Sequence, residues 1–185
     1  RILVRSSNIG SAHIGQLIGS ETQKNYMKQL GLLSASPLEI VENGVPLVPQ
    51  NWSHITTMTV SFGYGLSVSM AQAAAAIAAA GGDGHYIAPT LLRRNSNEPI
   101  EKLRIFSTET SMAVRSMMRL VVSNKIGTGN FADAPGYLVG GKTGTAEKVK
   151  NKKFNRKANR VSFVATFPAN DPAYLIMMMV DEPVG

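Results

Sequence analysis

Three short runs of strand-forming residues follow one another at the end of the chain, and they constrain the fold more than any other feature. The runs cover residues 137–147, 161–168 and 174–181. Between the last two, residues 169–172 read Ala-Asn-Asp-Pro, a composition typical of a tight turn, so we expect a hairpin there. The sequence therefore predicts an antiparallel three-stranded meander over residues 137–182.

Helical patterns occupy much of the chain before this meander, up to about residue 125. Residues 9–31 carry apolar side chains at helical spacings with a break at Gly19, which predicts two short helices. The alanine-rich run 70–80 predicts a buried helix that ends at the two glycines that follow it. Residues 107–123 predict an amphipathic helix.

Two segments show neither pattern. Residues 34–59 are rich in Pro, Asn, Ser and Thr, so we expect irregular surface structure there, with Trp52 as its anchor to the body. Residues 124–136 are expected to form a loop.

The positive charge of the chain is concentrated in one segment. The formal net charge is +7, and seven of the 19 basic residues lie between residues 148 and 160, where no acidic residue occurs. Such a run is typical of a solvated surface loop. Only Phe154 could stack on a base there, so we expect no nucleic-acid partner.

The residue types that bind metals are scarce and scattered. Cysteine is absent, which excludes disulfides and thiolate metal sites, and the three histidines are far apart in the sequence. We therefore expect no metal and no cofactor. No apolar run reaches membrane-spanning length.

The segment GGKTGTAEK, residues 140–148, fits two unrelated motifs. Read from Gly136 it matches the phosphate-binding P-loop, and the run LIMMMVDE at 175–182 adds a weak second match to that class of enzyme. A P-loop leads directly into a helix whose N-terminal amides bind the phosphates. No helical apolar stripe follows Lys142 and Thr143, which argues against this alternative.

The second motif is K-T-G, whose function depends on its position in an edge strand. Such a strand presents backbone amides and carbonyls along which a peptide-like ligand can lie. Lys142 supplies a cation, Thr143 and Thr145 supply hydroxyls suited to a carboxylate, and Gly144 leaves room for the ligand backbone.

Four motifs occur in a characteristic order: SSN at 6–8, SFGYG at 61–65 with Gln72 after it, GGKTGTA at 140–146 and VDEP at 180–183. Their order and spacing resemble class B penicillin-binding proteins, most closely the division-specific peptidoglycan D,D-transpeptidases. The resemblance implies an α/β (α+β) fold, in which helices flank an antiparallel sheet. It also implies that residues 1–185 are the C-terminal part of one transpeptidase domain, with the helical part at about 1–125.

The resemblance assigns roles to particular residues. Ser6 would relay a proton between the catalytic lysine, the nucleophile and the leaving amine, and Asn8 would hold the substrate amide or that lysine. Lys142 would support the relay, while Thr143 and Thr145 would receive the terminal carboxylate and the Thr145 amide would join the oxyanion hole. The alternatives are that Ser6 and Asn8 cap a helix beginning near Ile9 and that Lys142 is a surface lysine.

One motif of the family, S-x-x-K with the nucleophilic serine, is absent from all 185 residues. We therefore expect the sequence to be a fragment, or the ordered part of a longer chain, that begins downstream of the nucleophile. We expect it to be inactive alone and to leave an apolar C-terminal strand exposed. For the whole protein the resemblance implies peptidoglycan stem peptides, β-lactams and divisome proteins as partners, and a periplasmic domain at the inner membrane. A β-lactam-sensing module on the same fold is the alternative.

Overall fold

The computed structural model describes residues 1–95, 97–150 and 153–184. The chain forms two compact units, one made of Arg1–Ser6 with Arg115–Gly185 and the other of Ser7–Val114. One boundary between the units falls between Ser6 and Ser7, and the other falls within helix α5 (Thr108–Ser123). No helix in the described ranges is long and apolar enough to cross a membrane.

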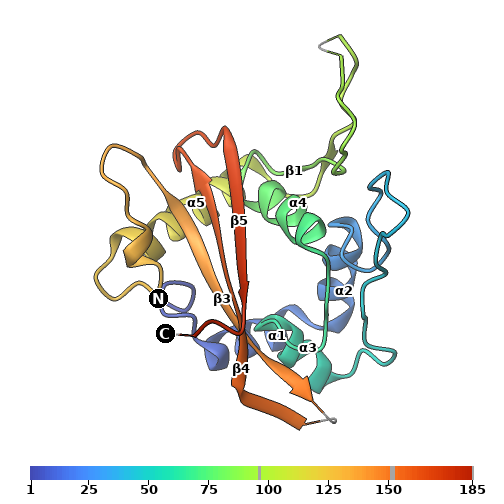
Figure 1. Cartoon of the computed structure of the whole chain (residues 1–185), viewed down its shortest axis with the longest axis vertical. Helices are drawn as coiled ribbons and strands as arrows, with labels where there is room; N and C mark the ends of the chain where they lie inside the picture. The colour runs from blue at the N-terminus through green and yellow to red at the C-terminus, as the bar shows by residue number, and fades with distance from the viewer. Residues whose placement is uncertain (96, 151–152, 185) are drawn as a thin grey trace. The chain divides into compact units, whose positions relative to one another are not determined.

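A three-stranded antiparallel sheet is the main element of the first unit (Figure 1). Its strands are β3 (Gly140–Lys150), β4 (Lys153–Phe167) and β5 (Tyr174–Asp181), in the order β3-β4-β5. The meander predicted from the sequence is confirmed by this pairing. Because β4 is central, β3 and β5 are the edges of the sheet within the described residues.

The basic segment departs from its predicted structure. It was expected to be a solvated loop, but β3 continues to Lys150 and β4 begins at Lys153, so most of it is paired strand. The many charged residues hide the alternation of apolar and polar side chains by which a half-buried strand is recognised in a sequence. The pairing is also irregular, because the register of the two strands shifts between Glu147 and Lys148. The side chains of residues 149–157 lie outside the described part of the structure, so the prediction that they meet no nucleic acid stays a prediction.

The two ends of this basic segment pair with the acids of the VDEP motif. The Lys148 ammonium donates to Asp181 Oδ2 at 3.1 Å and to Glu182 Oε1 at 2.7 Å, and Arg160 Nε lies 3.6 Å from Asp181 Oδ1. The hydrogen bonds to Glu182 and Asp181 raise the pKa of Lys148. This cluster joins β3 to the end of β5 across the central strand.

The core of the first unit contains α5 and β4. Val121 and Val122 of α5 and Val164 of β4 are at most 5% exposed. A Cβ at Gly140 would lie 3.1 Å from Ala169 Cβ and 3.3 Å from Arg119 N, so β3 begins in close contact with α5. The strand starts at Gly140 rather than at the predicted residue 137, because Tyr137 N–H donates to the Ala134 carbonyl in a turn.

The second unit is mainly helical. The two helices predicted around Gly19 are α1 (Asn8–Ile18) and α2 (Ser20–Gln29), and the alanine-rich helix is α4 (Met70–Gly81). The sequence did not predict the two-residue strands β1 (His85–Tyr86) and β2 (Leu103–Arg104), which are too short to show an alternating pattern.

Helix α3 (His54–Ser61) corrects the prediction that residues 34–59 are irregular throughout. Its sequence HITTMTVS is rich in β-branched residues of low helix propensity, so its stability comes from packing rather than from local preference. A Cβ on Gly15 of α1 would lie 2.0 Å from Ser61 Oγ, which shows how closely the two helices approach.

Two buried glutamines tie the second unit together. Gln72 Nε2 donates to the carbonyls of Gly31 at 2.8 Å and Ser34 at 2.7 Å, while its Oε1 accepts from Ser69 N in a capping box. Gln23 Oε1 accepts from Trp52 Nε1 at 3.0 Å, which confirms Trp52 as an anchor of its segment.

Replacing Gln72 with methionine, a residue of similar length, should lower the free energy of unfolding by about 2–4 kcal/mol. The substitution removes the donor of two part-buried hydrogen bonds to backbone carbonyls and breaks the capping box of α4. Urea denaturation measures the effect. Gln29→Met, at an exposed position, is the matched control and should stay within about 0.5 kcal/mol of the unsubstituted chain. Equal effects of both substitutions would contradict the role of Gln72.

Candidate functional site

The K-T-G residues lie in extended backbone on the edge strand β3. Lys142 pairs with Val164, and Thr143 pairs with Phe163 in the antiparallel ladder. The segment therefore does not lead into a helix, and the P-loop hypothesis is wrong because a phosphate cradle needs a helix N-terminus at this point.

Ser6 is held beside this strand within the first unit. The carbonyl of the buried residue Val4 accepts a hydrogen bond from Thr128 N at 3.3 Å, and Ser6 N donates to the Leu3 carbonyl at 3.2 Å. Ser6 has a φ of +50°, a left-handed conformation that is costly for a non-glycine residue and is enriched at functional sites.

The helix-capping alternative for Ser6 and Asn8 is wrong. The N-cap of α1 is Ser7, whose Oγ accepts from Gly10 N at 3.2 Å. Asn8 is the first residue of α1 and belongs to the second unit. Its membership in one site with Lys142 therefore stays a prediction.

The ammonium group of Lys142 makes the central contact of the site. It donates to Ser6 Oγ and to the Thr143 carbonyl at 2.8 Å, and it lies 3.5 Å from Thr143 Oγ1. The surface-lysine alternative is wrong, because the side chain is half-buried and burial lowers its pKa. Among the described residues no carboxylate forms an ion pair with it. A cation held by neutral groups gives up its proton more readily than one held by an acid.

Thr128 is a member of this cluster that the sequence did not reveal. Its Oγ1 lies 2.7 Å from Thr143 Oγ1 and 3.4 Å from Ser6 Oγ. The residue lies in the predicted loop 124–136, which supplied no motif. The available signal was the glycine on each side of it, since paired glycines in a loop mark a close approach of the backbone.

The other two predicted residues of the strand differ in their surroundings. Thr145 is exposed, as a ligand-binding group must be. A side chain at Gly144 would lie 2.6 Å from Ser162 Oγ on the neighbouring strand, so cross-strand packing is a second reason for glycine at this position.

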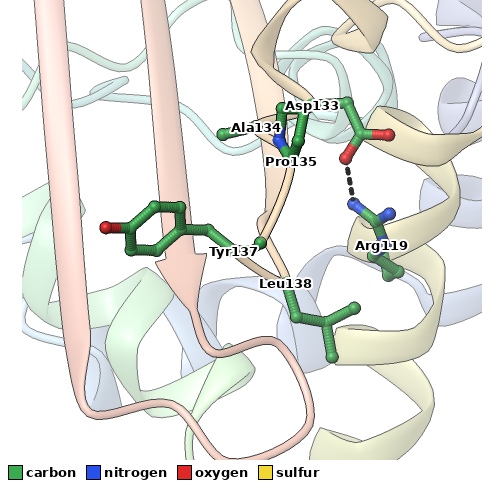
Figure 2. A pocket seen from close by; sticks show the side chains of 7 residues that line it. Arg119, Asp133, Ala134, Pro135, Tyr137 and Leu138 are labelled. Carbon is green, nitrogen blue, oxygen red and sulfur yellow. Dashed lines mark hydrogen bonds and ion pairs between the residues drawn. The ribbon is translucent and has the colours of Figure 1, made fainter.

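A cavity of about 400 Å³ is lined by the residues that directly precede β3 in the sequence and by Arg119 of α5 (Figure 2). The ion pair of Arg119 Nη1 with Asp133 Oδ1, at 2.8 Å, lines it together with Ala134, Pro135, Gly136, Tyr137 and Leu138. Arg119 Nη1 also donates to the Val139 carbonyl at 2.8 Å and so fixes the chain where it enters β3. None of the predicted site residues lines this cavity, so we assign it no catalytic part.

The described ranges contain no group of three or more His, Cys, Asp or Glu side chains that could hold a metal ion. The cluster consists of an ammonium and three hydroxyls. Such groups move protons and bind carboxylates; they are not the donors that soft or borderline metals prefer.

Comparison with known proteins identifies the type of domain. The family model described as the penicillin binding protein transpeptidase domain matches residues 1–184. A relative from Caulobacter vibrioides, named a probable peptidoglycan D,D-transpeptidase FtsI, is 34% identical over all of this chain and 32% of its own length. Stage V sporulation protein D of Bacillus subtilis is 32% identical over all of this chain and 30% of its own length.

Solved structures agree in fold. The transpeptidase domain of penicillin-binding protein 3 from Burkholderia pseudomallei is 35% identical, with a TM-score of 0.92 over 98% of this chain and 55% of that one. Penicillin-binding protein 3 from Mycobacterium tuberculosis, solved in complex with ampicillin, is 27% identical, with a TM-score of 0.89 over 98% of this chain and 44% of that one. The predicted fold class is confirmed, and the chain spans about a third of the length of these curated relatives.

We expect the Lys142 side chain to lose its proton below the ordinary lysine pKa of about 10.4, because burial disfavours the charged form. Side-chain NMR over a pH series measures the midpoint, and Lys142→Arg identifies the signal by removing it. Between the folded-state and unfolded-state pKa values the unfolded chain binds more protons, so the contribution of Lys142 to the free energy of unfolding rises with pH there. A midpoint at or above the ordinary value would contradict the burial argument.

Proposed function

The chain belongs to the penicillin-binding protein transpeptidase family, and on that premise we propose that it is part of a peptidoglycan D,D-transpeptidase. The enzyme would cross-link stem peptides through an acyl-enzyme and would react with β-lactams in the same way. The observation that carries the proposal is the hydrogen bond from the Lys142 ammonium to Ser6 Oγ, beside the edge strand β3. The two side chains can transfer a proton, and the edge strand offers backbone groups along which a peptide can bind.

We propose that Ser6 and Lys142 move the proton of the reaction. Ser6 would act as a relay: the catalytic lysine takes the proton of the nucleophilic hydroxyl, and the Ser6 hydroxyl gives its own proton to the leaving amine of D-alanine and is reprotonated by that lysine. The Lys142 ammonium, which already donates to Ser6 Oγ, would stabilise negative charge on that oxygen while the proton is away. Burial lowers the pKa of Lys142, and this supports the assignment because a lysine with a lowered pKa exchanges its proton at lower cost.

The remaining strand residues would bind the substrate. A stem peptide lying along β3 would form backbone hydrogen bonds with an edge that is free in the described structure. Thr143 and Thr145 would donate to its terminal carboxylate, and the Thr145 amide would donate to the oxyanion. Gly144, which has no side chain, would leave room between them for the backbone of the peptide. Asn8, from the first turn of α1, would hold the substrate amide or the catalytic lysine.

The 185 residues contain no S-x-x-K, and we propose that the nucleophile of this reaction lies outside them. We therefore propose that the chain is the C-terminal part of one transpeptidase domain and that another segment of the protein carries the attacking serine. We propose further that the whole protein acts in cell division, on the periplasmic side of the inner membrane and with divisome partners. The resemblance of its motifs to those of the division-specific transpeptidases supports that assignment.

Lys142→Met in the full-length protein should lower the rate of covalent labelling by a fluorescent penicillin by about 100-fold or more, because the variant loses the cation that supports proton transfer. The second-order rate constant of acylation, measured from a time course on gels, reports the effect. Lys28→Met, at an exposed position on α2, is the matched control and should label at the normal rate. Normal labelling of Lys142→Met would overturn the proposed function.

The 185-residue chain by itself, verified by intact mass, should form no stable adduct with the same penicillin, because it lacks the attacking hydroxyl. Mass spectrometry after incubation detects any adduct. A stoichiometric adduct on a verified chain would show that some other residue serves as nucleophile. Transfer of the acyl group from a thioester analogue of the stem peptide to an amine separates the enzyme from a β-lactam sensor, which would acylate without transfer.

A further inference from the structure

The loop Gly127-Thr128-Gly129 places one exposed hydroxyl between two buried glycines. A Cβ on Gly127 would lie 2.1 Å from the Val121 carbonyl oxygen, and a Cβ on Gly129 would lie 3.3 Å from Val121 Cγ1. Gly129 N also donates to the Val121 carbonyl at 3.2 Å. The loop is therefore pressed against α5 on both sides of Thr128, which leaves the threonine little freedom to move away from β3.

The hydroxyl held there closes a ring with groups that the proposed function already uses. The ring runs from the Lys142 ammonium to Ser6 Oγ, on to Thr128 Oγ1 at 3.4 Å, on to Thr143 Oγ1 at 2.7 Å, and back to the ammonium at 3.5 Å. Thr128 is the one member that belongs to neither the S-x-N nor the K-T-G motif. Without it, the hydroxyls of Ser6 and Thr143 are linked in the described structure only through the Lys142 ammonium, whose contact with Thr143 Oγ1 is long at 3.5 Å.

We propose that Thr128 is a positioning residue that couples the proton-transfer group Ser6 to the carboxylate-binding group Thr143. This inference rests on the proposed function of the site and adds a residue to it. The main-chain contact of Thr128 N with the Val4 carbonyl, at 3.3 Å, holds the loop and the segment of Ser6 together, so the hydroxyl has a fixed place from which to act.

When a carboxylate is bound, the number of protons that each group can donate decides in which direction the hydrogen bonds of the ring run. An ammonium can only donate, and each hydroxyl donates one proton while accepting others. If Thr143 donates its proton to a ligand carboxylate, it must accept from Thr128, which must then accept from Ser6, which accepts from Lys142. The hydrogen bonds then run in one sense from the cation to the anion, and chains aligned in this way strengthen one another.

The test compares two ligands in the full-length protein: benzylpenicillin, which carries a carboxylate, and its methyl ester, which does not. The quantity measured is the ratio of their second-order acylation rate constants. Thr128→Val, which keeps the shape but loses the hydroxyl, should lower this ratio about three- to ten-fold, the range expected for one neutral hydrogen bond. Thr128→Ser, which keeps the hydroxyl, should hold the ratio within about two-fold of the unsubstituted protein.

The ratio is chosen because a merely structural loss slows both ligands equally and leaves it unchanged. Thr128→Ala repeats the test without a branched side chain, so a folding defect of the valine variant alone does not decide the result. An unchanged ratio in both variants, or an equal fall in Thr128→Ser, overturns the coupling by Thr128 while the proposed function stands. Absence of acylation in the unsubstituted protein overturns the proposed function and this inference together.

Discussion

The antiparallel pairing of β3 with β4 decides the conformation of the K-T-G segment. β4 is paired on both sides, and its residues Val164, Ala165 and Thr166 are at most 8% exposed. These three consecutive side chains point to alternate faces, so this part of β4 is buried on both, and a slip of one residue would exchange the side chains that pack on each face. That register places Lys142 opposite Val164, and the extended backbone of the motif follows from it. The core of the first unit thus fixes the site, although no site residue lies in that core.

Burial of Lys142 sets the chemistry that this scaffold can support. Taking an ammonium partly out of water costs free energy, which an adjacent carboxylate would offset by holding the proton more firmly. Here the ammonium meets hydroxyl and carbonyl oxygens, and its pKa falls. The same contacts orient the group toward Ser6. A lysine in these surroundings is placed to exchange a proton, whereas the ion-paired Lys148 on the same strand, with a raised pKa, is placed to hold the sheet together.

The sequence predicted those features whose cause is local. Gly19 divides α1 from α2, and the turn at residues 169–172 joins β4 to β5, because both depend on residues adjacent in the chain. Helix α3 was missed because its β-branched residues disfavour a helix in isolation and its stability comes from packing on α1. The basic strands were missed because their pairing leaves no apolar alternation. Lys142 and Ser6 were found through motifs, whereas Thr128 acts through contacts with residues distant in the sequence.

The S-x-N triplet straddles a boundary between the two units, and this separates the roles of its members. Ser6 belongs with Lys142, Thr143 and Thr128, so the hydrogen-bonded ring is complete within one compact unit. Asn8 opens α1 in the other unit. The left-handed conformation of Ser6 lies at that boundary, where the chain leaves one unit and Ser7 caps the first helix of the next. This positive φ is costly for serine, and it occurs at the residue that contacts Lys142 and directly precedes the N-cap of α1.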